Sequence, residues 1–232
     1  IIWTTTPWTI PVNRALAYNK KIKYSVIQMG KDTENFKDKN IIIASELVNK
    51  VSQECKFKDF KIIKEFNGDD FKNTVCQHPL IDLGYNYDVP MLEGNFVTLE
   101  QGTGIVHTAP SHGPDDFNLC LKHGLKAPDT MNDAGIYTKE IPFFSGMHIF
   151  KADSVVIDKL SESKSLLGNG KLQHSFPHSW RSKAPLVYRA TPQWFISMEK
   201  NNLRKKALKA IDDTTFYPPR GKDRIRSMIE TR

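Results

Sequence analysis

The chain has 232 residues, of which 39% are hydrophobic and 25% charged, as in globular proteins large enough to bury a core. No apolar run approaches the roughly 20 residues of a membrane span, and no secretory signal opens the chain. The three cysteines lie far apart, which excludes a disulfide framework and a Cys-x-x-Cys metal site. We therefore expect a protein of a reducing compartment, the cytoplasm, with no membrane partner.

The formal net charge of +7 is concentrated near the C-terminal end of the chain. Residues 178–232 carry 13 Lys and Arg against five Asp and Glu, a net charge of +8, so residues 1–177 are close to neutral. A basic flank on a neutral body favours an anionic partner, most often nucleic acid. The alternative is a solvated surface of two basic helices, predicted over 200–211 and 221–232. Charge alone leaves both interpretations open.

The first residues are unusual for the start of a chain. Ile1-Ile2-Trp3 has the character of a strand and is not preceded by Met, which predicts a fragment of a longer protein. The segment Thr4–Asn13 combines two prolines with three consecutive threonines, so we expect a rigid extended loop and exclude a helix. Its hydroxyl groups offer hydrogen-bond donors and acceptors beside an apolar wall, Trp8. The alternative is a β-edge with exposed threonines.

Further elements follow from hydrophobic periodicity and from turn and cap signals. We expect strands at 22–29, 40–44 and 57–66, a helix at 45–54 capped by Ser45, and an amphipathic helix at 153–164. Many short strands with a few inserted helices predict an α+β fold built on a β-barrel.

A domain boundary is expected near Leu172, where the periodic pattern gives way to a basic tail. This divides the chain into a barrel-like domain over residues 1–171 and a mixed C-terminal extension over residues 172–232.

The stretch Asn95–Phe117 gathers the polar residues around which we expect a site. It is predicted to open as an alternating strand, pass two glycines and form a short apolar strand that carries His107. A helix then begins near Pro114, with two aspartates in its first turn, and ends at Gly124. Polar groups that converge at a strand-to-helix junction are typical of a binding cleft.

Two familiar kinds of site are not predicted for this stretch. Gly102 and Gly104 form only half of a dinucleotide-binding signature, and no helix follows them directly, so close backbone approach is favoured over cofactor binding. No nucleophile elbow or Ser-His-Asp order is present either. A hydrolysis here would use water that polar groups position.

A zinc site is the main alternative for the polar residues of this stretch. His107, His112, Asp115 and Asp116 have suitable side chains, but they share one short loop and one helix start without a remote fourth ligand. The aspartates also suit helix capping. One suffices as a cap, and the second is then free to bind an ammonium group.

Three stretches of the chain resemble the editing domains of isoleucyl-tRNA synthetases, a large insertion in the catalytic fold of those class I enzymes. They read WTTTPWTIPVNRA at 3–15, GTGIVHTAPSHGPDD at 102–116 and YRATPQWFISM at 188–198. The related valyl and leucyl domains have T-T-R-P where this chain has a threonine before Pro7, which favours the isoleucyl branch.

The resemblance implies hydrolysis of valine wrongly esterified to the terminal adenosine of tRNA(Ile). It implies that Asp116 holds the α-ammonium group of the substrate and that His107 lines the side-chain pocket and excludes isoleucine. The resemblance also implies that further residues contact the ester, the adenosine and the attacking water or form the wall of the pocket: Thr4, Thr5, Thr6, Trp8, Asn13 and Gly104. Of these, Thr5 and Thr6 are expected to be catalytic together with Asp116.

The resemblance also defines the expected cofactors and partners. Ser179 and Ser182 stand where many relatives have a Cys-x-x-Cys metal knuckle, so no zinc is expected. The nucleotide-binding signatures of the synthetic site are absent, and ATP and Mg²⁺ are expected only with the full-length enzyme. The expected partners are the 3′ end of tRNA(Ile) carrying valine and the remainder of the synthetase, with the chain as a monomer. The alternatives are a noncatalytic tRNA-docking module and a metallohydrolase.

Overall fold

The computed structural model describes residues 1–173 and 175–231, and it separates into two compact units, Ile1–Ala190 and Thr191–Arg232. The functional division expected after residue 171 stays a prediction. Two residues of the predicted extension, His174 and Arg232, lie outside the described residues.

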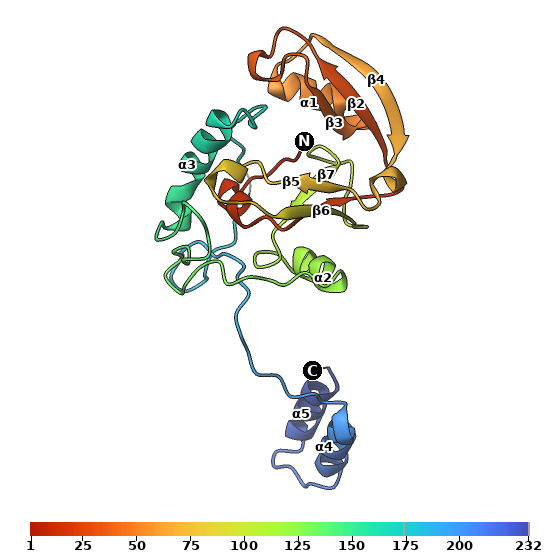
Figure 1. Ribbon diagram of the computed structural model, residues 1–232. Coiled ribbons are helices and arrows are strands. Elements are labelled where there is room, and N and C mark those ends of the chain that lie inside the picture. The colour runs from red at the N-terminus through yellow and green to blue at the C-terminus, as the bar shows by residue number, and fades with distance from the viewer. Residues whose placement is uncertain (174, 232) are drawn as a thin grey trace. The chain divides into compact units, whose positions relative to one another are not determined.

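All strands named below belong to the first unit (Figure 1). In chain order they are β1 (Ala15–Tyr18), β2 (Lys23–Met29), β3 (Asn40–Ala44), β4 (Phe60–Asn67), β5 (Val75–Gln77), β6 (Asp88–Glu93) and β7 (Ile105–Thr108). One sheet has the order β5-β6-β1-β7 and the other the order β3-β2-β4. Strands β1 and β6 are parallel, and the other paired strands are antiparallel.

The helices divide between the two units. The α-helices are α1 (Val48–Cys55), α2 (Pro114–Lys122), α3 (Ile149–Glu162), α4 (Leu203–Asp212) and α5 (Arg220–Glu230). Short 3-10 helices are η1 (Pro7–Val12), η2 (Glu34–Phe36), η3 (Ser45–Leu47), η4 (Gly68–Phe71), η5 (Ile81–Leu83) and η6 (Lys200–Asn202). Across the described part of the chain, no helix combines the length and apolar character needed to cross a bilayer.

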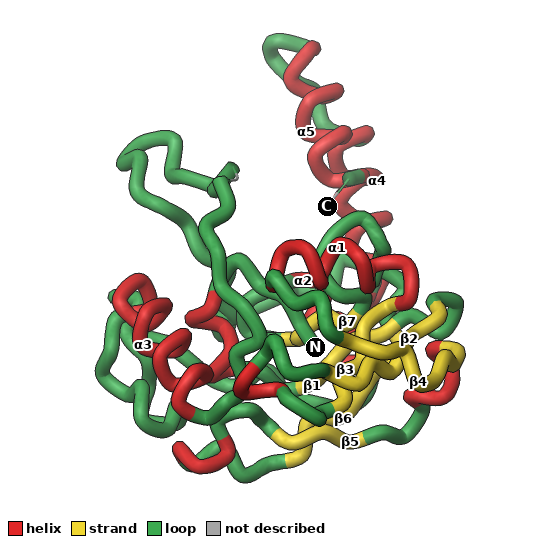
Figure 2. Tube along the Cα trace, turned by 90° about the horizontal axis from the view of Figure 1, so that it is seen from above, coloured by secondary structure: helices red, strands yellow, loops and turns green. Residues whose placement is uncertain are grey.

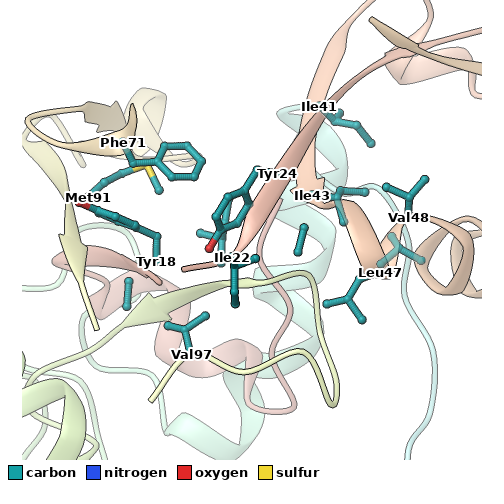
Figure 3. Close-up of a cluster of buried hydrophobic side chains, with 14 of the residues drawn as sticks. Tyr18, Ile22, Tyr24, Ile41, Ile43, Leu47, Val48, Phe71, Met91 and Val97 are labelled. Carbon is teal, nitrogen blue, oxygen red and sulfur yellow. The ribbon is translucent and has the colours of Figure 1, made fainter. Parts of the chain in front are cut away.

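The predicted α+β class is confirmed, whereas its barrel detail is not. In residues 1–173 and 175–231 the named strands form two open sheets, and neither sheet closes on itself. The sheets are joined by a shared core of side chains from β1, β2, β3, β6 and α1. In Figure 3, Tyr24 and Phe71 lie together in this core, with their ring centroids 4.8 Å apart.

A second core lies beneath η1 and α3, and it holds Trp8, Ile10 and Val156. Helix α3 packs directly against η1 and lies to one side of the strands (Figure 2). Its predicted range was nearly right, but the helix begins earlier, at Ile149, where the His148 side chain accepts a hydrogen bond from the Phe150 amide. The end of β7 lies between the two cores, since Ile105 belongs to the first and Ala109 to the second.

The prediction of an extended loop at Thr4–Asn13 was wrong, because residues Pro7–Val12 form a 3-10 helix. Proline is compatible with the first turn, where its missing N–H has no partner in any case. Pro11 removes one further donor from this helix. The carbonyl of Trp8 accepts a hydrogen bond from the Tyr137 hydroxyl instead.

Three other local expectations also fail. Ile1-Ile2-Trp3 and the stretch at 95–101 form turns and irregular chain where strands were expected. Ser45 does not cap a helix, because its hydroxyl bonds the buried Ser25 hydroxyl at 2.8 Å. By contrast, α2 begins at Pro114 as predicted and ends at Lys122, two residues before the expected stop at Gly124, which has a φ of +74°.

Candidate active site

Three consecutive residues at the end of β7 each bind a residue from another part of the candidate site. The hydrogen bonds are His107 Nε2 to Thr9 Oγ1 (2.9 Å), the Thr108 amide to Asn13 Oδ1 (3.1 Å) and the Ala109 amide to Asp116 Oδ2 (2.8 Å). We call these three residues, His107–Ala109, the β7 junction. The junction therefore connects η1, the residue that follows η1 and the first turn of α2.

Asp116 has one oxygen fixed and one free of protein donors. Its Oδ2 accepts from the Ala109 amide, and no donor among the described residues reaches Oδ1. The side chain packs against Gly113, where an added Cβ would lie 3.3 Å from the carboxyl carbon. Burial raises the pKa of Asp116 to about 6, the Ala109 hydrogen bond opposes this rise, and nearby Asp115 adds to it. The site thus holds a partly desolvated carboxylate with an open oxygen.

His107 is only 8% exposed, and just one of its two ring nitrogens has a partner. Nε2 bonds Thr9, whereas Nδ1 is buried without a hydrogen bond from any described residue. Burial lowers the pKa of His107 to about 4, and the nearby His112 and His78 contribute. The imidazole is therefore neutral at physiological pH.

The threonines form a hydroxyl network that reaches His107. Thr6 Oγ1 lies 3.3 Å from Thr4 Oγ1 and 3.4 Å from Thr9 Oγ1, and Thr9 continues to His107. Thr5 is exposed. Thr9 was not singled out from the sequence, although its spacing of three residues from Thr6 places both on one side of a 3-10 turn.

Trp8 is buried and held from two directions. Its amide donates to Asp153 Oδ1 of α3 at 2.8 Å, and its ring meets His112 edge-on with the centroids 4.9 Å apart. His78 holds the next part of η1, since its Nε2 bonds the carbonyl of Ile10 at 2.9 Å. Asp153 and His78 lie 145 and 68 residues from their η1 partners, so no local signal reveals either contact.

Asn13 and Gly104 have evident roles in the fold. Asn13 Oδ1 is occupied by the Thr108 amide. Gly104 has a φ of +78°, and an added Cβ would lie 2.4 Å from the Cβ of Ala44. The absence of a side chain at Gly104 therefore allows β3 to pack closely against the backbone there. Substrate binding by these two residues stays a prediction.

The side chains considered for zinc do not form a ligand set. Both ring nitrogens of His112 are engaged, Nδ1 with the Tyr188 carbonyl at 2.9 Å and Nε2 with the Thr130 hydroxyl at 2.8 Å. Asp115 is exposed. Over the described ranges, no group of three or more His, Cys, Asp or Glu has an arrangement that suits a metal ion.

Two surface hollows are lined by residues outside the β7 junction. One, of about 260 Å³, is lined by residues 196–206 of the second unit. The other, of about 680 Å³, lies between α1 and the start of β4. Neither is lined by a predicted site residue.

A family comparison identifies the chain. The model of tRNA synthetases class I (I, L, M and V) matches residues 7–232. The chain belongs to this synthetase family. The synthetase relatives include isoleucine–tRNA ligases of Pelagibacter ubique, 64% identical over the whole chain, and of Gluconobacter oxydans, 44% identical over the whole chain. The chain spans 26% of the length of each of these relatives.

Solved structures show that the synthetase chain has a known fold. The structure described as GlLeuRS-CP1 matches with a TM-score of 0.56 and 16% identity, covering 73% of this chain and 83% of that one. The editing domain of Plasmodium falciparum cytosolic leucyl-tRNA synthetase matches with a TM-score of 0.51 and 14% identity, covering 70% and 75%. At such identities the likeness concerns the fold alone.

Proposed function

We propose that this chain is the editing unit of an isoleucyl-tRNA synthetase and hydrolyses the ester that joins valine to the 3′ end of tRNA(Ile). The similarity to isoleucine–tRNA ligases over the whole chain supports this proposal, as does the fold shared with solved editing domains. The observation that carries it is the Asp116 carboxylate, fixed by one oxygen at the β7 junction and open at the other. In the reaction, water adds to the carbonyl carbon of the ester. The bond between that carbon and the ribose oxygen then breaks, and the ribose oxygen takes a proton.

Asp116 is the anchor for the α-ammonium group of the valyl ester. A carboxylate that is partly removed from water gains more from a cation than an exposed one does, because the surrounding polarity is low. Its pKa of about 6 leaves it ionised at neutral pH. The hydrogen bond from Ala109 fixes Oδ2, and Oδ1 remains available to the ammonium group.

His107 supplies the size limit. An apolar pocket distinguishes groups that differ by one methylene by only about 1–3 kcal/mol, a limit for which isoleucine and valine are the standard example, so a second and smaller pocket is needed. The buried imidazole is fixed by Thr9. We assign to it the contact that admits valine and excludes isoleucine.

The remaining predicted residues complete the site in this proposal. Thr4, Thr5, Thr6 and Asn13 position the ester, the adenosine and the attacking water, Trp8 forms a wall, and Gly104 is a minor contact. No protein nucleophile and no metal ion take part. ATP and Mg²⁺ serve only the synthetic site of the full-length enzyme, which we propose acts as a cytoplasmic monomer.

Deacylation of Val-tRNA(Ile) by Asp116→Asn tests the proposal. The amide oxygen still accepts from the Ala109 amide, but the charge is lost, so we expect kcat/KM to fall about 100-fold. Asp115→Asn removes a charge from the same helical turn at an exposed position and serves as the matched control. Equal activity of Asp116→Asn and the unaltered chain would refute the assignment.

The alternative is a noncatalytic tRNA-docking module, which the basic second unit favours. It predicts salt-sensitive tRNA binding without ester cleavage by the unaltered chain. The same deacylation assay therefore distinguishes the two functions.

A further inference from the structure

The hydrogen bonds around Thr9 determine which nitrogen of His107 carries the proton. A threonine hydroxyl has one hydrogen to donate and two lone pairs that accept. Thr9 Oγ1 lies 2.7 Å from the Thr6 carbonyl, which can only accept, so the hydroxyl hydrogen is directed there. Towards His107 Nε2, at 2.9 Å, Thr9 must then act as the acceptor. His107 therefore donates from Nε2, and its Nδ1 carries a bare lone pair.

The opposite arrangement is less favourable for two reasons. If Thr9 donated to Nε2, the short bond to the Thr6 carbonyl would be lost. The proton would then lie on Nδ1, which is buried and has no partner among the described residues. A buried N–H without a partner is rarer in proteins than an acceptor with spare capacity.

We propose that Thr9 is a positioning residue that holds His107 as the Nε2–H tautomer, so that Nδ1 accepts a hydrogen bond from an N–H or O–H donor of the bound substrate. This inference rests on the proposed editing function, whose substrate brings two such donors, the α-ammonium group and the free hydroxyl of the terminal ribose. It gives His107 a polar role beside its role in size exclusion. Nδ1 is buried and has no partner among the described residues, so its capacity to accept a hydrogen bond is unused in the absence of substrate.

Two variants separate this role from simple packing. Thr9→Val keeps the shape of the side chain and removes the hydroxyl, whereas Thr9→Ser keeps the hydroxyl. We expect Thr9→Val to lower kcat/KM for Val-tRNA(Ile) about 10-fold, the value of one lost hydrogen bond to a charged or polar group, and Thr9→Ser to restore most of it. Thr138→Val is the control, because it removes a hydroxyl that bonds only the Asp129 carbonyl on the surface.

The tautomer itself is measured by two-bond ¹H–¹⁵N correlation spectra of the full chain labelled with ¹⁵N-histidine, with the His107 signal assigned from its loss in His107→Gln. We expect the unaltered chain and Thr9→Ser to show the Nε2–H pattern, and Thr9→Val to show a mixture. A His107 proton on Nδ1 in the unaltered chain would overturn the inference, even if Thr9→Val failed to fold. Unchanged tautomer and activity in a folded Thr9→Val would overturn it too.

A substrate that lacks the free terminal ribose hydroxyl identifies the donor. If the ribose hydroxyl is the donor, the 10-fold effect of Thr9→Val disappears with this tRNA; if the ammonium group is the donor, the effect persists. Absence of any deacylation by the unaltered chain would refute the editing function, while the spectra would still report the tautomer. Deacylation with the proton on Nδ1 would refute only the positioning role of Thr9 and the acceptor role of His107.

Discussion

At the scale of single residues, burial shifts the pKa values of Asp116 and His107 in opposite directions. Burial raises the pKa of Asp116 to about 6 and lowers that of His107 to about 4. Between about pH 5 and neutral pH, His107 is therefore largely uncharged, and of these two residues Asp116 is the one that titrates. The site therefore combines the Asp116 carboxylate, ionised at neutral pH, with a neutral His107 ring, which suits a cationic ligand.

The pH dependence of kcat/KM should report Asp116. An ionised carboxylate is required to bind an ammonium group, so activity approaches its full value by about pH 7, is half-maximal near pH 6 and falls below that, approaching 10-fold for each further unit. The profile for Val-tRNA(Ile) between pH 5 and 8 measures this, and Asp116→Asn should remove the step. A profile that stays flat down to pH 5, as an exposed carboxyl with an ordinary pKa would give, would contradict the assignment.

His107→Ala should broaden the amino acids that are cleaved. Removing the ring opens space in the proposed pocket, so hydrolysis of Ile-tRNA(Ile) should rise by about 10-fold or more while that of Val-tRNA(Ile) changes less. Parallel deacylation assays of the two esters give the ratio. Retained discrimination would remove His107 from the pocket.

At the scale of elements, η1 depends on partners that are distant in sequence. Asp153 of α3 accepts from the Trp8 amide, and His78 bonds the Ile10 carbonyl. Burial lowers the pKa of His78 to about 4, so this histidine is neutral when it donates to Ile10. A six-residue 3-10 helix with two prolines has few backbone hydrogen bonds of its own, and the side chains of Asp153 and His78 add hydrogen bonds that stabilise it.

Replacing Asp153 tests the dependence of η1 on α3. Asp153→Ala leaves the Trp8 amide without its acceptor, and we expect a loss of about 1–3 kcal/mol in the free energy of unfolding. Urea denaturation measures it, with Asp153→Asn expected to recover part of the loss through its amide oxygen. Asp158→Ala, an exposed position on the same helix, is the control, and an equal effect of both alanine variants would contradict the prediction.

At the scale of the whole molecule, the basic charge belongs largely to the second unit. Its helices α4 and α5 are joined by the ion pair of Arg226 with Asp212, whose closest atoms lie 2.5 Å apart. Lys205, Lys206 and Lys209 on α4 are exposed, and among the described residues they form no ion pair. These lysines are therefore available to an anionic partner.

Changing Lys205, Lys206 and Lys209 to Gln should weaken binding of tRNA(Ile) and flatten its salt dependence. Each lost phosphate contact lowers the slope of log affinity against log salt by about one. Binding measured from about 50 to 200 mM salt gives the slope. Lys61 and Lys64 changed to Gln on β4 of the first unit are the control. An unaltered slope in the α4 variant would show that this surface does not contact the RNA.

The parts of the structure that were predicted correctly have strong local signals. Helix α2 has Pro114 at its first position and a glycine shortly after its end, and β3 has three consecutive isoleucines. The failures arise where a distant partner overrides local preference. Ser45 was expected as a cap but bonds Ser25 on a neighbouring strand, and η1 forms despite its prolines.

By itself, the sequence determined the α+β class, the basic C-terminal helices and the residue types of the candidate site, because these follow from composition, periodicity and short motifs. Only the tertiary structure decided how those residues meet. In the folded chain, hydrogen bonds join Asp116 to Ala109, Asn13 to Thr108 and Thr9 to His107. These bonds join segments up to 98 residues apart, and which donor finds which acceptor depends on how two sheets and α3 pack, which no local pattern encodes.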